Sequence, residues 1–179
     1  DWHLVANPAA AYAKFAVYRG ERRVGDVEWG LLGRHNAENG LAALVAAHHA
    51  GVDEAVAIEA LCRFRGVRRR LEVRGTVDGV VVYDDFAHHP TAVASTLEGV
   101  RLKAGAGRVF AVLEPRSNTM KLGTHKAALA DSLRGADRVF VYKSPEVKWD
   151  VGDAMVPLGS LVVVHEDLAR LTEAIVAES

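Results

Sequence analysis

Two carboxylates and two imidazoles stand close together in the segment DDFAHHP at residues 84–90. Asp84 and Asp85 follow the apolar, β-branched run 80–83, which is typical of a buried strand, and Pro90 suits the first turn of a helix. Ligands bind outside the carboxyl ends of strands in open α/β sheets. We therefore expect a ligand site here, with Asp85 facing the ligand and Asp84 paired structurally with a nearby arginine.

The two histidines of this segment favour the binding of an anion. His88 and His89 suit Mg²⁺ poorly as direct ligands, because that ion prefers oxygen ligands and water. Their N–H groups could instead donate hydrogen bonds to a phosphate or to a developing oxyanion. For His89, the simpler role of capping the following helix stays open.

Polar residues also follow each of three later apolar runs, which we expect to be strands at about 109–113, 139–142 and 161–164. Parallel strands would bring all these residues, with the segment 84–89, to one edge of a sheet and into a shared crevice. Ordinary solvated loops are the alternative. The residues are Glu114, Arg116, Ser117, Asn118, Lys143, Ser144, His165 and Glu166.

A separate cluster of one imidazole and two amides, His35, Asn36 and Asn39, lies near the start of an alanine-rich helix expected over 37–50. A carboxamide offers a donor and an acceptor side by side, which matches the N6 and N7 edge of adenine. Capping of the helix is the alternative role for Asn36. Asn39 lies inside the helix, where helix propensity gives no reason for an asparagine.

Two basic segments could bind anions. The arginines at 68–70 present fork-shaped donors suited to phosphate. The loop RSNTMK at 116–121 is a dense set of donors for carboxylates, although Ser117 or Thr119 could instead cap a helix. No G-x-x-x-x-G-K-[ST] phosphate loop occurs in the chain.

The elements that must position these residues change in type along the chain. Residues 1–12 show little pattern, a hairpin is expected over 15–19 and 23–29, and Asp53 is a suitable N-cap for a helix ending near residue 64. Asp78-Gly79 predicts a two-residue turn between strands at 71–77 and 80–84. The remaining expected elements are helices at 90–102, 121–133 and 167–177 and a long loop at 144–159.

This alternation of strands and helices predicts an α/β fold, Rossmann-like, with a mostly parallel sheet and helices on both faces. The pattern changes at about 65–69, where we expect a domain boundary. The 179 residues suffice for one domain, or for one domain and part of another. The single Cys62 excludes an internal disulfide, and no apolar run approaches the roughly 20 residues of a membrane span.

The net charge of −1 argues against broad binding to nucleic acid or membrane, and a cytoplasmic location is expected. The sequence does not indicate the oligomeric state.

Several motifs together resemble those of the Mur ligases, the ATP-dependent amide-forming enzymes of peptidoglycan precursor synthesis. They are GRHNAEN at 33–39, GVRRRLE at 66–72 and DDFAHHPT at 84–91, in the order and spacing of that family. The segment EPRSNTMK at 114–121 is similar to the corresponding segment of those family members that join UDP-N-acetylmuramate to recycled L-Ala-γ-D-Glu-meso-diaminopimelate.

The resemblance implies that residues 1–66 are the C-terminal remainder of a central ATP-binding domain. Residues 67–179 would be the C-terminal Rossmann-like ligase domain, without its last strand. It also implies site residues. The cofactor contacts would be His35, Asn36 and Asn39 at the adenine, and Arg70 and Asp85 at the ribose and phosphates. The catalytic residue near the transferring phosphate would be His88. The residues that face the peptide would be Arg116, Ser117, Asn118 and Lys121.

The implied cofactors are ATP and Mg²⁺, with the metal ligands mostly outside this chain, and the implied mechanism passes through an acyl phosphate of the muramoyl carboxylate. The chain alone is expected to be an inactive fragment. The alternatives are the UDP-N-acetylmuramate–L-alanine ligase of the same family, and a metal-dependent phosphoesterase that uses Asp84, Asp85, His88 and His89.

Overall fold

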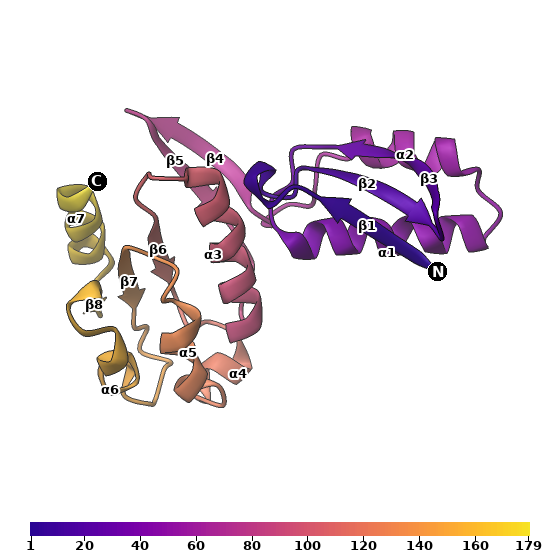
Figure 1. Cartoon of the computed structure of the whole chain (residues 1–179). Helices are drawn as coiled ribbons and strands as arrows, with labels where there is room; N and C mark the ends of the chain where they lie inside the picture. Colours follow the sequence, from indigo (N-terminus) through magenta and orange to yellow (C-terminus); the bar gives the residue numbers. More distant parts are fainter. The chain divides into compact units, whose positions relative to one another are not determined.

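The computed structural model describes all 179 residues, which form two compact units (Figure 1). The first unit contains residues 1–73, 83–85 and 98–105, and the second contains residues 74–82, 86–97 and 106–179. The domain boundary expected after residue 66 stays a prediction.

The first unit is built on an antiparallel sheet of β1 (Trp2–Ala6), β2 (Lys14–Arg19) and β3 (Arg22–Glu28), in that order. The expected hairpin of β2 and β3 is confirmed. Strand β1 lies where we expected little pattern. Its side chains alternate between half-buried and exposed, but Val5 is an apolar residue on the exposed face, so the sequence alternation is broken.

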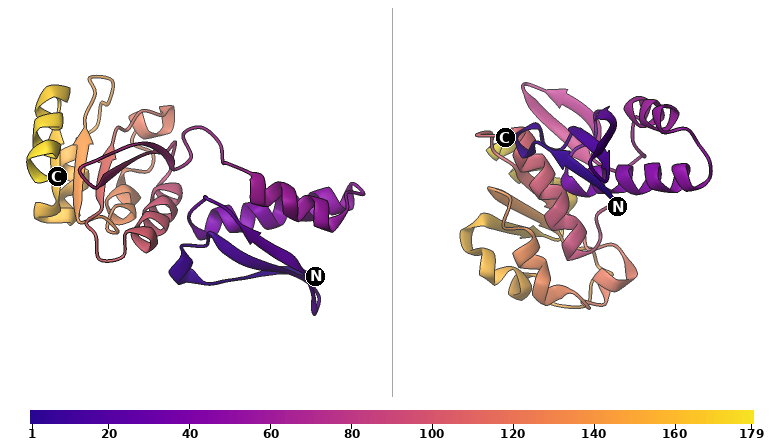
Figure 2. Two further views of the ribbon diagram at one scale, coloured as in Figure 1. Left: turned by 90° about the horizontal axis from the view of Figure 1, so that it is seen from above. Right: turned by 45° about the vertical axis from the view of Figure 1, so that its right-hand side comes forward.

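Helices α1 (Arg34–His49) and α2 (Glu54–Arg63) lie on the same side of this sheet (Figure 2). As expected, Asp53 caps α2, and its Oδ1 accepts hydrogen bonds from the backbone N–H groups of Ala55 and Val56 at 2.9 and 3.3 Å. The helices and the sheet enclose one apolar core. Its buried members are Phe15, Val17, Val27, Trp29, Ala37, Leu44 and Ala57.

Strands β4 (Glu72–Val77) and β5 (Val80–Asp84) form a separate two-stranded sheet. The expected turn is confirmed, since Asp78 and Gly79 have φ of 49° and 84°, and a type I′ turn requires positive φ at both positions. The expectation that 80–83 is a buried strand is wrong, because its three valines are 42–51% exposed. A two-stranded sheet has no third strand or second layer to cover its apolar side chains.

The second unit contains a parallel sheet of β6 (Phe110–Leu113), β7 (Arg138–Tyr142) and β8 (Val162–His165), in that order. Helix α7 (Leu168–Glu178) lies on one side of the sheet and the first part of α3 (Pro90–Ala104) on the other (Figure 1). The central strand β7 is the most buried. The expected α/β class, with helices on both faces of a parallel sheet, is confirmed.

The single helix expected at 121–133 is divided into α4 (Asn118–Lys121) and α5 (Lys126–Ser132). The division has a local cause at Gly123, whose φ of 70° is incompatible with a continuous right-handed helix. A Cβ atom at this position would also lie 2.9 Å from Cδ1 of Trp149.

The expectation of a long loop at 144–159 is also wrong in part. This stretch contains α6 (Val151–Met155) and most of a 3₁₀ segment, Val156–Leu161. The side chain of Asp150 caps α6 by accepting a 3.0 Å hydrogen bond from the N–H of Asp153. No helix of the structure has the length and apolar character needed to cross a bilayer.

Candidate functional site

An imidazole nitrogen is left without a partner at the start of α1. Gly33 precedes the helix with φ of 89°, and a Cβ atom there would lie 2.8 Å from Cε1 of His35, so the ring packs directly on the glycine. Nδ1 of His35 is buried and makes no hydrogen bond. A buried polar atom without a partner is uncommon and requires an explanation.

The two asparagines of this helix differ in their surroundings. Nδ2 of Asn36 donates a 2.7 Å hydrogen bond to the carbonyl of Leu32. The capping alternative for Asn36 is wrong, because Gly33 is the N-cap residue of α1 and no side chain caps this helix. Asn39 is exposed and lies four residues after His35, so the two side chains share one face of α1. The structure thus places His35 and Asn39 on one face of α1, and the nucleotide roles of His35, Asn36 and Asn39 stay predictions.

Carboxylates hold the turn that leads into β4. Oδ2 of Asp85 accepts a 2.8 Å hydrogen bond from the N–H of Leu71, which has φ of 49°. Nε of Arg69 lies 3.6 Å from Oδ2 of Asp84, as expected for a structural pair. These contacts place Arg70 between two residues that are tethered to the end of β5. Arg70 and Asp85, two of the expected nucleotide contacts, are therefore close in one turn.

The histidines after β5 lie in the second unit and have different partners. Nδ1 of His88 is 2.9 Å from the carbonyl oxygen of Phe86, so this nitrogen carries the proton, and the residue is exposed. Nδ1 of His89 accepts a 3.3 Å hydrogen bond from the N–H of Thr91 at the start of α3. This contact favours the capping alternative for His89.

The loop after β6 contains the four expected peptide-facing residues. Arg116 and Asn118 are exposed, whereas the hydroxyl of Ser117 caps α4 by accepting a 3.3 Å hydrogen bond from the N–H of Met120. Lys121 forms an ion pair with Glu146, and the hydrogen bond from Lys121 lowers the pKa of that carboxyl. The capping alternative thus holds for Ser117, and Lys121 already has one carboxylate partner in Glu146.

The exits of β7 and β8 lie at the same edge of the parallel sheet. Nζ of Lys143 is 2.7 Å from Oε1 of Glu166, a contact that raises the pKa of the lysine, and the N–H of Lys143 donates to the carbonyl of His165 at 2.9 Å. The expectation that the segment 84–89 leaves another strand of this sheet is wrong, because β5 pairs only with β4.

Glu146 and Trp149 are contacts of the loop 116–121 that we did not expect. They lie in the stretch assigned to a long loop, and only the unusual presence of a tryptophan there could have pointed to a buried contact. No group of three or more His, Cys, Asp or Glu side chains is placed to hold a metal ion.

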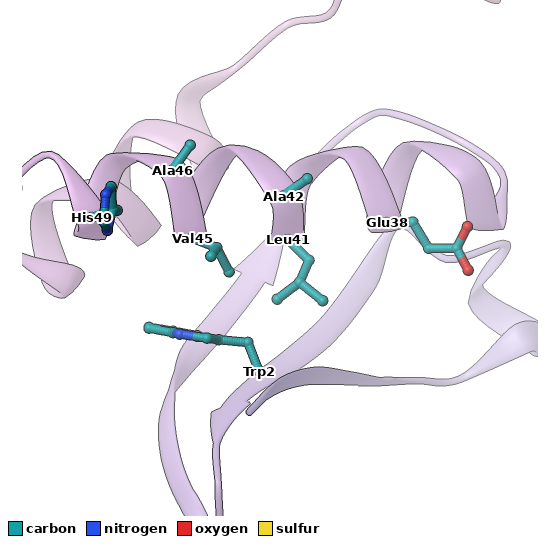
Figure 3. Close-up of a pocket in the computed structure, with 7 residues that line it drawn as sticks. All are labelled: Trp2, Glu38, Leu41, Ala42, Val45, Ala46 and His49. Atoms are coloured by element: carbon teal, nitrogen blue, oxygen red, sulfur yellow. The ribbon is translucent and has the colours of Figure 1, made fainter.

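The first unit also has a hollow whose lining shares no residue with these clusters. Figure 3 shows the ring of Trp2 beneath the Leu41 and Val45 side chains of α1. None of the expected site residues lines it.

Comparison with known proteins identifies relatives of this chain. The family described as "Mur ligase, glutamate ligase domain" matches residues 69–179. The chain is 45% identical over 166 residues (92% of its length) to a Haemophilus influenzae protein and 54% identical over 132 residues (73%) to one from Escherichia coli; both are named UDP-N-acetylmuramate--L-alanyl-gamma-D-glutamyl-meso-2,6-diaminoheptandioate ligase.

The solved structure of a murein peptide ligase from Psychrobacter arcticus matches 98% of the chain at 35% identity, with a TM-score of 0.68. Proteins named UDP-N-acetylmuramate--L-alanine ligase match at lower identity, 38–44%. The chain spans 37% and 29% of the lengths of the Haemophilus and Escherichia proteins, and 38% of the Psychrobacter chain.

Proposed function

Because this chain belongs to the Mur ligase family, we propose that it is part of an ATP-dependent ligase that joins UDP-N-acetylmuramate to L-Ala-γ-D-Glu-meso-diaminopimelate. The similarity to two ligases of that name, over 92% and 73% of the chain, is the observation that carries the proposal. The UDP-N-acetylmuramate–L-alanine ligase, our first alternative, is less favoured because such enzymes match at lower identity.

The nucleotide would be held by the first unit. His35 fits this role because its buried Nδ1 has no partner in the chain, and Asn39 adds an exposed amide on the same face of α1. A ring nitrogen and a carboxamide together complement the hydrogen-bonding edge of adenine. The turn fixed by the Leu71–Asp85 hydrogen bond would present Arg70 and Asp85 to the ribose and phosphates. Asn36 would support this site through its bond to Leu32.

His88 would act at the phosphate that is transferred. Its Nδ1–H is directed to the carbonyl of Phe86, so the neutral ring has an acceptor at Nε2, and Nε2 can donate to a phosphate oxygen only when the ring is protonated. A protonated His88 would thus add one positive charge and one donor at the developing charge, which is the main need of phosphoryl transfer.

The acceptor peptide would be held by the second unit. Arg116 and Asn118 are exposed donors for its carboxylates, and Ser117 keeps the loop in place as the cap of α4. Lys121 would join them when it exchanges Glu146 for a substrate carboxylate. The peptide amine would then attack the acyl phosphate of the muramoyl group, form the amide bond and release inorganic phosphate.

Mg²⁺ is the expected metal of the complete enzyme, where it would reduce the charge repulsion between the phosphates. The residues of this chain do not by themselves provide its site, because no three acidic or imidazole side chains converge. The metal would therefore be held by the nucleotide and by residues outside this chain. A cytoplasmic location stays a prediction.

The test is a competition between acceptors in the complete ligase that contains this chain. The enzyme is supplied with ATP, Mg²⁺, UDP-N-acetylmuramate and equal concentrations of the tripeptide and L-alanine, and the products are resolved by mass spectrometry. We expect the tripeptide adduct, with one ADP formed per amide bond. Formation of the L-alanine adduct as main product would support the alternative, and turnover without ATP would refute both.

A further inference from the structure

Helix α4, which carries Asn118 and Lys121, is too short to be stable by itself. It has only four residues, and isolated helices need about 12–15 residues to be even marginally stable in water. The chain leaves it through Gly123 in a left-handed conformation and through Leu122, which is 80% exposed. Contacts with another part of the chain must therefore hold this turn in place.

Trp149 supplies such a contact from a position 29 residues later. Its Nε1–H donates a 2.7 Å hydrogen bond to the carbonyl of Met120, an oxygen that also accepts from the N–H of Gly123 at 3.0 Å. The ring lies against Gly123 so closely that a Cβ atom there would be 2.9 Å from Cδ1. The indole thus fixes both the last turn of α4 and the glycine at which the helix is interrupted.

The segment that carries Trp149 is itself anchored. In this segment, residues 145–150, Val147 is buried and Asp150 caps α6. Glu146, in the same segment, makes a second contact with α4 through its ion pair with Lys121. The segment 145–150 therefore holds α4 at two points, one polar and exposed and one part-buried.

We propose that Trp149 is a positioning residue for the peptide acceptor. It holds the loop 116–121 in the conformation that presents Arg116 and Asn118. This inference rests on the proposed function, because it assigns the loop to the acceptor. Trp149 itself does not contact the reacting groups. Loss of its hydrogen bond should weaken binding of the peptide and leave binding of ATP unchanged.

The first experiment measures the turn directly and needs no activity. Amide hydrogen exchange is followed in the 179-residue chain for the wild type and for Trp149→Phe, which removes the indole N–H and keeps an aromatic ring. One lost hydrogen bond predicts about fivefold faster exchange in peptides that cover residues 118–124. Trp2→Phe makes the same chemical change in the other unit and should leave these peptides unchanged. Equal exchange in wild type and Trp149→Phe would overturn the proposal.

The second experiment measures kinetics in the complete ligase. For Trp149→Phe we expect the KM for the tripeptide to rise about fivefold, with kcat and the KM for ATP changed by less than about twofold. Gly123→Ala should give the same pattern, because its Cβ would push Trp149 away. Equally large changes in kcat, in the KM for the tripeptide and in the KM for ATP would show a general structural role and overturn the proposal. Failure of the wild-type enzyme to ligate the tripeptide would instead refute the proposed function.

Discussion

The hydrogen bond between Leu71 and Asp85 should be worth more than the neighbouring ion pair of Arg69 and Asp84. The first is a 2.8 Å contact of a half-buried carboxylate with a backbone N–H, and such bonds to charged groups contribute about 1.5–3 kcal/mol. The second joins atoms 3.6 Å apart in side chains that are 53% and 35% exposed, and such surface pairs contribute about 0–1 kcal/mol.

We therefore expect Asp85→Ala to lower the free energy of unfolding of the 179-residue chain by about 2 kcal/mol, or the Tm by about 4–8 °C. Asp85→Asn keeps an acceptor oxygen and should lower the free energy of unfolding by less than about 1 kcal/mol. Asp84→Ala is the matched control, with an expected loss below about 0.5 kcal/mol. Thermal denaturation by circular dichroism measures all three variants.

The same variants separate fold from binding in the complete ligase. Asp85→Asn keeps the turn but removes the negative charge, so an increase in the KM for ATP in this variant would indicate a direct contact with the nucleotide. The reasoning would be refuted if Asp84→Ala and Asp85→Ala destabilised the chain equally, because the Leu71 hydrogen bond would then carry no special weight.

Three further predictions concern other residues. His88→Ala in the complete ligase should lower the single-turnover rate about 10²–10³-fold, as for other lost donors to developing charge, with the KM values for ATP and peptide unchanged; a change in KM alone would contradict this role. The isolated chain should bind ATP weakly, with a Kd on the order of 1 mM by calorimetry, and micromolar affinity would contradict the division of the nucleotide site between this chain and other parts of the enzyme. The hydrogen bond from Arg138 lowers the pKa of Glu178 below its ordinary value of 4.5, so this pair should stabilise the fold above pH 4.5 and lose its contribution as the pH falls further. Arg138→Gln should remove this part of the acid sensitivity in denaturation curves measured at a series of pH values, and unchanged sensitivity would refute the prediction.

Features fixed by a few adjacent residues could be predicted from the sequence. Asp78-Gly79 determines its turn because both residues adopt positive φ, and Asp53 determines the start of α2 through its own side-chain oxygen. The alternation of strands and helices after residue 90 likewise predicted the parallel sheet, because each strand is strongly apolar and the central strand β7 is buried.

Features that depend on distant partners could not be predicted. An apolar run such as 80–83 indicates a strand, but its exposure depends on which strands pair with it, and here only β4 does. The interruption of the helix at Gly123 depends on a glycine conformation and on Trp149, 26 residues away in the sequence. The ion pair of Lys121 with Glu146 also joins two loops that no local pattern connects.

The central claim is that this chain holds the nucleotide and the acceptor with different residues, and a double-mutant cycle tests it most directly. The KM values for ATP and for the tripeptide are measured in the complete ligase with Asp85→Asn, with Arg116→Ala and with both changes; Arg134→Ala, whose side chain pairs with Asp131, serves as the control for loss of an exposed arginine in the second unit.

We predict that Asp85→Asn raises only the KM for ATP, that Arg116→Ala raises only the KM for the tripeptide, and that the two free-energy changes add in the double variant within about 0.5 kcal/mol. If both substitutions raised the KM of the same substrate, or if Arg134→Ala matched Arg116→Ala, the assignment of the two sites would be wrong.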